Sequence, residues 1–187
     1  MVVFDASILL ALLQPDIYSP RHPDTKEPVD QFRQRIDYLV TQLEADFQKI
    51  VIPTPALSEI LVRAGQAGPE YLDRFNSASV FRIVPFDQRA AVEVAAIIAS
   101  AINAGDKRGG SDSSWAKVKF DYQIVAIAKV ENISTIYSDD RDIYNFGQRN
   151  GLTVIRTAEL PLPPVDPQGA LELDENSVGE EDIPPIR

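Results

Sequence analysis

Carboxylate side chains are the residues of this sequence best placed to do chemistry. Asp5 follows an apolar run over residues 1–4, and Asp139 and Asp140 follow a second run over residues 134–137. Both runs have the composition of buried β-strands. Because ligands of parallel sheets bind at the carboxyl ends of the strands, we expect these carboxylates to face a common site.

Two further acidic residues fall near the same predicted edge. Glu59 lies about one turn into a helix that follows a strand over residues 50–52, and its neighbours are apolar. Asp121 opens an apolar helix over residues 122–130. Each acid has an ordinary alternative, because Asp121 could cap its helix, Glu59 could be solvated and strand-end aspartates could start turns. Their combination at one edge is what indicates a site.

A divalent cation is the natural partner of such a cluster. No basic residue adjoins Asp5, Glu59 or Asp121 in the sequence, so the gathered carboxylates would repel one another. Mg²⁺ and Mn²⁺ prefer oxygen ligands. Such ions lower the pKa of a bound water and neutralise charge on the leaving oxygen of a phosphodiester. The residues therefore predict a metal-dependent phosphodiester hydrolase with water as the nucleophile.

The composition excludes most other catalytic chemistries. The chain of 187 residues has no cysteine and a single histidine, His22. The lack of cysteine excludes disulfides, thiolate nucleophiles and cysteine-ligated metal sites, and one histidine argues against a Ser-His-Asp triad. No apolar stretch approaches the ~20 residues that cross a bilayer, and the N-terminus does not resemble a signal peptide. We therefore expect a cytoplasmic protein without a membrane partner.

The acidic excess is concentrated at the end of the chain. There are 28 acidic and 18 basic residues, which gives a formal charge of −10. Residues 166–187 hold seven acidic residues and one basic residue, and so carry six of the ten net negative charges. We predict one domain over residues 1–160, followed over residues 161–187 by a Pro-rich acidic tail that is extended or disordered.

Apolar strands alternate with helices along the predicted domain. The predicted strands cover residues 1–4, 50–52, 80–84, 134–137 and 152–155. The predicted helices cover residues 8–13, 29–48, 54–63, 69–78, 87–102, 122–130 and 143–148, and residues 15–28 and 103–119 are predicted loops. This order is typical of an α/β protein, a three-layer α/β/α sandwich with a mainly parallel central sheet of about five strands.

Five segments resemble, in order, the motifs of PIN-domain ribonucleases, in particular the VapC-like toxins. They are VFDASILLALL at 3–13, TPALSEI at 54–60, VPFDQRAA at 84–91, DYQIVAIA at 121–128 and YSDDRDI at 137–143. The resemblance spans residues 1 to 160 and implies a PIN-like fold. Residues 15–28, residues 104–119 and the acidic tail depart from the pattern of a small toxin.

The resemblance also implies which residues form the site. The catalytic positions that it implies are Asp5, Glu59, Asp121 and Asp140. Asp139 and Asp142 are further candidate metal ligands, and the fourth ligand stays open among these two and Asp140. Ser7 and Ser138 match hydroxyl positions that support the site, and the implied cofactor is Mg²⁺ or Mn²⁺. The implied activity is that of an endoribonuclease, the toxin of a toxin–antitoxin pair, which binds an antitoxin protein and forms a homodimer.

Local clusters of basic residues could bind RNA on an otherwise acidic protein, because phosphate contacts dominate affinity. The predicted substrate-binding residues are Lys107, Arg108, Lys117 and Lys119. Trp115 in the same segment could stack on a base or pack against the core. Arg21, His22 and Lys26 form a second candidate cluster.

Three other kinds of protein were weighed against the nuclease, because acidic residues at strand ends occur in them as well. Aspartyl-phosphate phosphatases need a second aspartate where this chain has Ser7, and response-regulator receivers need a phosphorylatable aspartate where it has Pro53 or Pro85. Both therefore fit poorly. A PIN-like module that binds RNA or protein without turnover stays open as the alternative to the enzyme.

Overall fold

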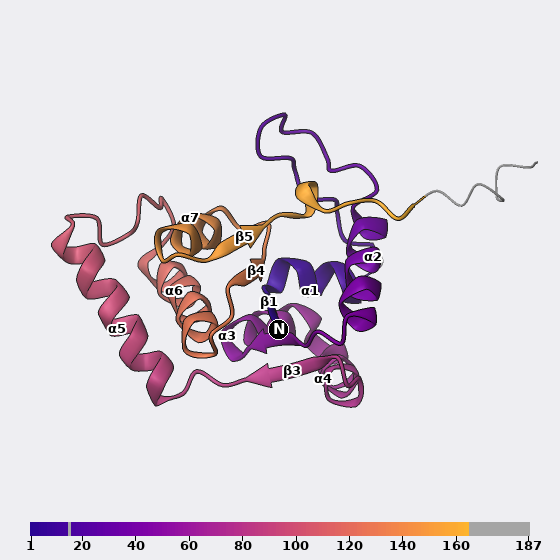
Figure 1. Cartoon of the computed structure of the whole chain (residues 1–187), viewed down its shortest axis with the longest axis horizontal. Coiled ribbons are helices and arrows are strands. Elements are labelled where there is room, and N and C mark those ends of the chain that lie inside the picture. Colours follow the sequence, from indigo (N-terminus) through magenta and orange to yellow (C-terminus); the bar gives the residue numbers. More distant parts are fainter. Residues whose placement is uncertain (15, 165–187) are drawn as a thin grey trace, which may run out of the picture.

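Five parallel strands form the centre of the protein. The computed structural model describes residues 1–14 and 16–164, so the predicted tail from residue 165 onward lies outside it. The strands are β1 (Val2–Phe4), β2 (Ile50–Pro53), β3 (Phe81–Val84), β4 (Thr135–Tyr137) and β5 (Thr153–Ile155). They are all parallel, in the order β3-β2-β1-β4-β5 (Figure 1). The predicted parallel sheet is confirmed.

Helices connect the strands and cover the sheet in an α/β/α arrangement (Figure 1). They are α1 (Ala6–Leu13), α2 (Phe32–Ala45), α3 (Thr54–Ala64), α4 (Gly68–Ser77), α5 (Gln88–Asn103), α6 (Trp115–Val130) and α7 (Arg141–Arg149), with short 3₁₀ turns η1 (Gly65–Ala67) and η2 (Thr157–Glu159). Within the described residues, no helix is long and apolar enough to cross a membrane.

The strands at the centre of the sheet are buried on both faces. Every residue of β1 and β2 is buried, whereas β3, at one edge of the sheet, is partly exposed. Continuous apolar runs, rather than alternating ones, are what a parallel sheet covered on both faces requires. The neighbouring positions of β1 and β4 bring the ends of these strands together, since the backbone N–H of Asp5 donates to the carbonyl of Tyr137 at 3.1 Å.

Helix α6 begins earlier than the sequence pattern predicted. It starts at Trp115, and the hydroxyl of Ser114 caps it by accepting from the Lys117 N–H at 3.3 Å. Residues 115–119 are therefore helical, and the predicted loop is shorter. The prediction that Asp121 opens this helix was wrong, and so was the alternative that it caps the helix, because it lies in the interior of α6. The start of the helix was predicted too late because a Ser-rich run precedes it and its first turns contain polar residues.

Two loops surround the carboxyl edge of the sheet. Residues 16–31 contain little regular structure apart from a bridge that pairs Arg21 with Pro28. The loop before α6 is held at Gly109, which has a φ of +64° and faces Phe146 so closely that a Cβ would lie 2.4 Å from its ring. Glycine is required there both for the backbone conformation and for the close approach.

Candidate metal and active site

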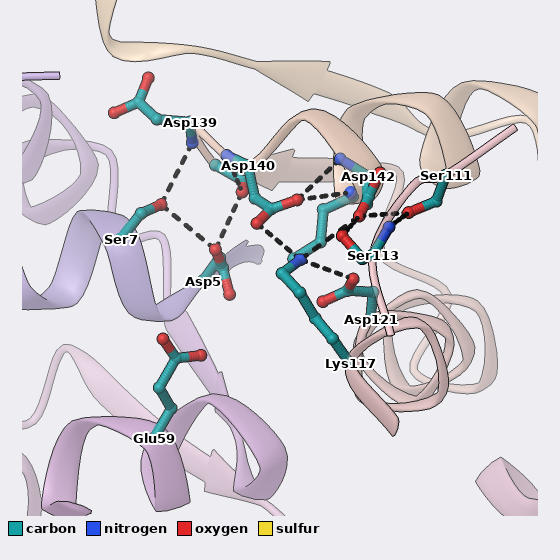
Figure 2. Close-up of polar contacts among 12 residues, drawn as sticks. Asp5, Ser7, Glu59, Ser111, Ser113, Lys117, Asp121, Asp139, Asp140 and Asp142 are labelled. Atoms are coloured by element: carbon teal, nitrogen blue, oxygen red, sulfur yellow. Dashed lines mark hydrogen bonds and ion pairs between the residues drawn. The ribbon is translucent and has the colours of Figure 1, made fainter. Parts of the chain in front are cut away.

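Asp5 lies at the buried end of β1. It precedes α1, and its Oδ2 accepts hydrogen bonds from the hydroxyls of Ser7 at 3.2 Å and Ser138 at 2.9 Å (Figure 2). The pKa of Asp5 is raised from 3.8 to about 6, mainly by burial and in smaller part by the charges of Asp140 and Glu59, while its hydrogen bonds act in the opposite direction. The two predicted supporting hydroxyls thus fix the orientation of this carboxylate.

Asp140 caps helix α7 with one carboxylate oxygen. Its Oδ1 accepts from the backbone N–H groups of Asp142 at 2.7 Å and Ile143 at 3.3 Å. The Asp140 N–H donates to the Ser138 hydroxyl at 3.0 Å, so Ser138 connects Asp140 with Asp5. Capping leaves Oδ2 of Asp140 facing the other acids (Figure 2).

Asp121 and Asp142 join Asp140 in one cluster. One oxygen of each of the three carboxylates lies within 4.8 Å of the others. Burial raises the pKa of Asp121 from 3.8 to about 7, although Lys117 opposes this effect. Burial also acts to raise the pKa of Asp142, but hydrogen bonds from Ser113 and Ser111 outweigh it, so that this pKa is lowered.

The ammonium of Lys117 lies among these three carboxylates (Figure 2). Its Nζ is 2.9 Å from Asp121, 2.9 Å from Asp140 and 3.5 Å from Asp142. Burial acts to lower the pKa of Lys117, but the contacts with Asp140 and Asp121 outweigh it and raise this pKa above its usual value. A cation therefore already occupies the centre of the cluster, which shows that the arrangement of oxygens favours positive charge there.

Two of the predicted acids lie apart from the cluster. Glu59 is half exposed on α3 and forms an ion pair with Arg63 at 2.7 Å. The Asp139 carboxylate is directed away from Asp5 (Figure 2). It accepts from the Thr157 N–H at 2.8 Å and the Thr157 hydroxyl at 2.5 Å. Burial raises the pKa of Asp139. The structure thus places Asp121, Asp140 and Asp142 together, with Asp5 beside them, Glu59 on the facing wall and the Asp139 carboxylate turned toward Thr157.

A cavity of about 730 Å³ opens over these acids. Asp5, Glu59, Asp121 and Asp140 line it together with apolar side chains, whereas Asp142 lies behind this lining. Three of those apolar residues are exposed at its rim: Tyr18, Val62 and Phe120. The cavity therefore combines a carboxylate floor with an apolar rim, which suits a ligand with both charged and aromatic parts.

Of the four predicted substrate-binding residues, only Lys117 lines this cavity. Lys119 lies two residues further along α6, which places it on roughly the opposite side of the helix. Lys107 lies over the ring of Trp115, 4.2 Å from its centroid. Trp115 is partly buried and packs against the core, as the packing interpretation predicted, while Arg108 is exposed.

The sequence patterns did not predict three hydroxyl residues of the site, nor the contact of Lys117 with the carboxylates. Ser111 and Ser113 donate to Asp142 at 2.7 and 2.6 Å, and Thr157 holds Asp139. These contacts join residues far apart in sequence, and no local pattern marks them. The role of Lys117 had a local signal, because it lies four residues before Asp121 and such pairs meet on a helix surface.

Comparison with known proteins identifies solved structures of similar shape. No protein-family model matches the chain, and no curated protein matches it. A VapBC2 complex from Rickettsia felis bound to a promoter DNA fragment contains a chain that is 16% identical, with a TM-score of 0.52, over 83% of this chain and 98% of that one.

Two other structures give the same result. A DNA-bound VapBC from Salmonella typhimurium contains a chain that is 14% identical, with a TM-score of 0.52, over 83% of this chain and 97% of that one. VapC20 from Mycobacterium tuberculosis, described as a Sarcin-Ricin loop cleaving toxin, is 13% identical, with a TM-score of 0.53, over 86% of this chain and all of that one. The VapC-like, PIN-like α/β/α fold predicted from the motifs is therefore confirmed, and the identities are too low to establish more than the fold.

Proposed function

From the fold that this chain shares with VapC proteins, we propose that it is a divalent-metal-dependent endoribonuclease. The observation that carries the proposal is the cluster of Asp121, Asp140 and Asp142, whose carboxylate oxygens lie within 4.8 Å of one another. Asp5 lies beside the cluster, at the carboxyl end of the neighbouring strand. A buried group of carboxylates is costly unless it is compensated by positive charge.

The donor set fits Mg²⁺ or Mn²⁺, since every candidate ligand is an oxygen. Asp121, Asp140 and Asp142 would hold the ion, with Asp5 as a further ligand and Glu59 reaching it from the facing wall. When bound, the ion would supply a water of lowered pKa and would neutralise charge on the phosphodiester.

The chain's own residues have separable roles in this proposal. Ser7 and Ser138 hold Asp5 in one orientation through its Oδ2. The N-terminus of α7 holds Oδ1 of Asp140 and so directs Oδ2 toward the cavity. Because burial raises the pKa of Asp5 to about 6 in the metal-free protein, binding of the ion would displace a proton from this carboxylate when the pH lies near or below 6.

The cavity is consistent with a single-stranded RNA substrate. The exposed rings of Tyr18 and Phe120 lie at the rim of the cavity, where unpaired bases could stack on them. Among the structurally similar proteins, VapC20 is described as cleaving the Sarcin-Ricin loop, which supports RNA as the substrate class. A ribonuclease of this kind would act in the cytoplasm.

The proposal extends to a toxin role with an antitoxin partner. Two of the similar structures are VapBC complexes bound to DNA, which supports a protein partner for a chain of this fold. We propose the homodimer from the resemblance of the sequence motifs to those of VapC-like toxins. Co-expression with candidate partners, followed by size-exclusion chromatography and mass measurement, would test both assemblies.

RNA cleavage with Mg²⁺ or Mn²⁺, compared with EDTA, tests the enzymatic proposal. Asp5→Asn and Asp121→Asn should abolish cleavage, whereas Asp37→Asn, a change on the exposed face of α2, should not alter it. Cleavage that survives both EDTA and Asp5→Asn would refute the assignment.

The alternative is a PIN-like RNA- or protein-binding module without turnover. The observation that favours it is Lys117, because its ammonium already compensates part of the carboxylate charge. RNA binding without cleavage under any metal condition would support this alternative over the enzyme.

A further inference from the structure

A second cavity, of about 410 Å³, lies next to the carboxylate site. Four basic side chains line it, from Arg21, Lys26, Arg141 and Arg156. The acidic residue in its wall is Asp139, which also lines the first cavity. In a chain with a formal charge of −10, a pocket with four basic residues and one acidic residue is a strong local reversal of sign.

The two basic residues from the loop are held by a compact turn. Arg21 pairs with Pro28 in a β-bridge, and its guanidinium donates to the carbonyl of Lys26 at 2.8 Å. The Lys26 N–H donates to the carbonyl of His22 at 3.0 Å, and Lys26 itself has a φ of +64°. These contacts fix the backbone around Arg21 and Lys26, so that both side chains can reach one pocket.

The other two basic residues come from the sheet edge. Arg141 is the first residue of α7 and directly follows Asp140. Arg156 follows β5, and its guanidinium lies over the ring of Tyr144, 3.7 Å from the centroid. Rigid elements therefore carry one side of the pocket, and the turn from the loop carries the other.

Most of the positive charge of this pocket has no carboxylate partner among the described residues. Across residues 1–14 and 16–164, none of the four basic side chains forms an ion pair with a carboxylate. Asp139 is engaged by two hydrogen bonds from Thr157 and is turned away from Asp5 (Figure 2). Like charges gathered in one pocket raise its potential and attract an anion.

Phosphate groups are the anions that this pocket fits best. Three of the four basic residues are arginines, whose planar guanidinium binds phosphate through two parallel hydrogen bonds. The pocket and the carboxylate cavity share Asp139 in their walls, so a strand that passes over the acids reaches the basic pocket without leaving the surface. Of the repeated phosphates along such a strand, one would lie over the acids, where a bound divalent ion would neutralise it, and a neighbouring one would lie in the basic pocket.

We propose that the pocket of Arg21, Lys26, Arg141 and Arg156 binds backbone phosphodiesters of a single-stranded RNA, beside the bond held at the carboxylates. The inference rests on the proposed function, because it assigns a second contact region to the same substrate. It gives the loop over residues 16–31 a role in positioning RNA.

Fluorescence anisotropy with a labelled single-stranded RNA tests the proposal. The measurement is made in EDTA, so that it reports RNA binding without metal-dependent cleavage. Arg21→Gln, Lys26→Gln and Arg141→Gln should each weaken binding and reduce the slope of log K against log salt by about 0.7. Arg74→Gln, on the exposed surface of α4 and outside both cavities, is the matched control and should leave the slope unchanged. Circular dichroism melts should show that all variants remain folded.

The outcomes separate this inference from the proposed function. Unchanged affinity and slope in the three pocket variants would overturn the inference even if the wild-type protein cleaves RNA. Weaker binding in these variants supports it, even if no cleavage is found. An oligonucleotide with a 5′-hydroxyl should bind as well as one with a 5′-phosphate. A strict need for the 5′-phosphate, or binding of inorganic phosphate alone, would replace the backbone assignment with a terminal-phosphate or small-anion site.

Discussion

The ammonium of Lys117 lies 2.9 Å from the carboxylate of Asp140, although 23 residues separate them in the sequence. The same ammonium contacts Asp121, four residues along α6, at 2.9 Å. Lys117 therefore joins two acids that come from different elements, in the place where a metal ion would compensate them. Metal binding and this internal ion pair compete for the same carboxylate charge.

Replacement of Lys117 by glutamine should strengthen metal binding and lower the stability of the metal-free protein. Loss of the charged hydrogen bonds should lower the free energy of unfolding without metal by about 1–3 kcal/mol. Removal of the competing cation should increase the rise in Tm that Mn²⁺ produces. Thermal melts with Mn²⁺ and with EDTA measure both effects. Lys119→Gln, on the same helix but outside the cavity, is the control. An equal Mn²⁺ shift in wild type and Lys117→Gln would exclude the competition.

The carboxylates should make the stability of the metal-free protein depend on pH. Folding raises the pKa of Asp5 from 3.8 to about 6 and that of Asp121 from 3.8 to about 7. At a pH between the unfolded-state and the folded-state pKa of each carboxylate, the native state binds more protons than the unfolded state. The contribution of these groups to stability therefore falls as pH rises. Their contribution is fully present below about pH 4 and is lost by about pH 7.

Asp121→Asn isolates this effect. The variant should gain stability relative to wild type, on the order of 1 kcal/mol, as pH rises from about 5 to about 7 in EDTA. Urea unfolding at the two pH values measures the difference. Parallel pH dependences of the two proteins would show that Asp121 is not the titrating group. Because metal ligands must be deprotonated, cleavage by wild type should increase over the same pH range.

The sheet and the strand-end acids were predictable because their signals are local. Apolar runs that end at Asp5 and at Asp139–Asp140 indicate buried parallel strands, and neighbouring strands bring their ends together. The start of α6 was not predictable in this way, since the Ser-rich segment before it has the composition of a loop. That error moved Asp121 to a helix end and left Lys117 outside the helix, so their i,i+4 pairing was missed.

Contacts between distant segments form the rest of the site. Ser113 and Asp142 are 29 residues apart, and Thr157 and Asp139 are 18 residues apart. Their hydrogen bonds decide which carboxylate faces the cluster and which turns away. The choice among the three aspartates of the YSDDRDI motif therefore depends on tertiary partners, and the sequence could only leave it open.

The loop before α6 should depend on the close contact between Gly109 and Phe146. Gly109→Ala places a Cβ 2.4 Å from the Phe146 ring in a residue with a φ of +64°. Gly105→Ala adds a Cβ at a similar φ of +75°, but nothing lies within 4 Å of it. Backbone strain alone should cost about 1 kcal/mol in both variants, and overpacking should add about 1–3 kcal/mol only at Gly109.

Chemical denaturation of the two glycine variants measures the difference. The loop carries Ser111 and Ser113, which hold Asp142, so Gly109→Ala should also weaken Mn²⁺ binding. Equal destabilisation by Gly109→Ala and Gly105→Ala would show that the contact with Phe146 adds nothing to stability.

Removal of the predicted acidic tail should leave the domain intact. A chain that ends at Pro164 retains every strand and helix of the structure, so its Tm and its RNA cleavage should equal those of the full chain.

A chain that ends at Arg156 is the contrasting variant. It lacks Thr157, whose two hydrogen bonds hold Asp139, and the buried side chain of Leu160. Loss of a buried leucine and of those bonds should lower stability by about 2–5 kcal/mol. A large loss of Tm in the chain that ends at Pro164 would contradict the predicted boundary, because it would show that the last residues contribute to the folded domain.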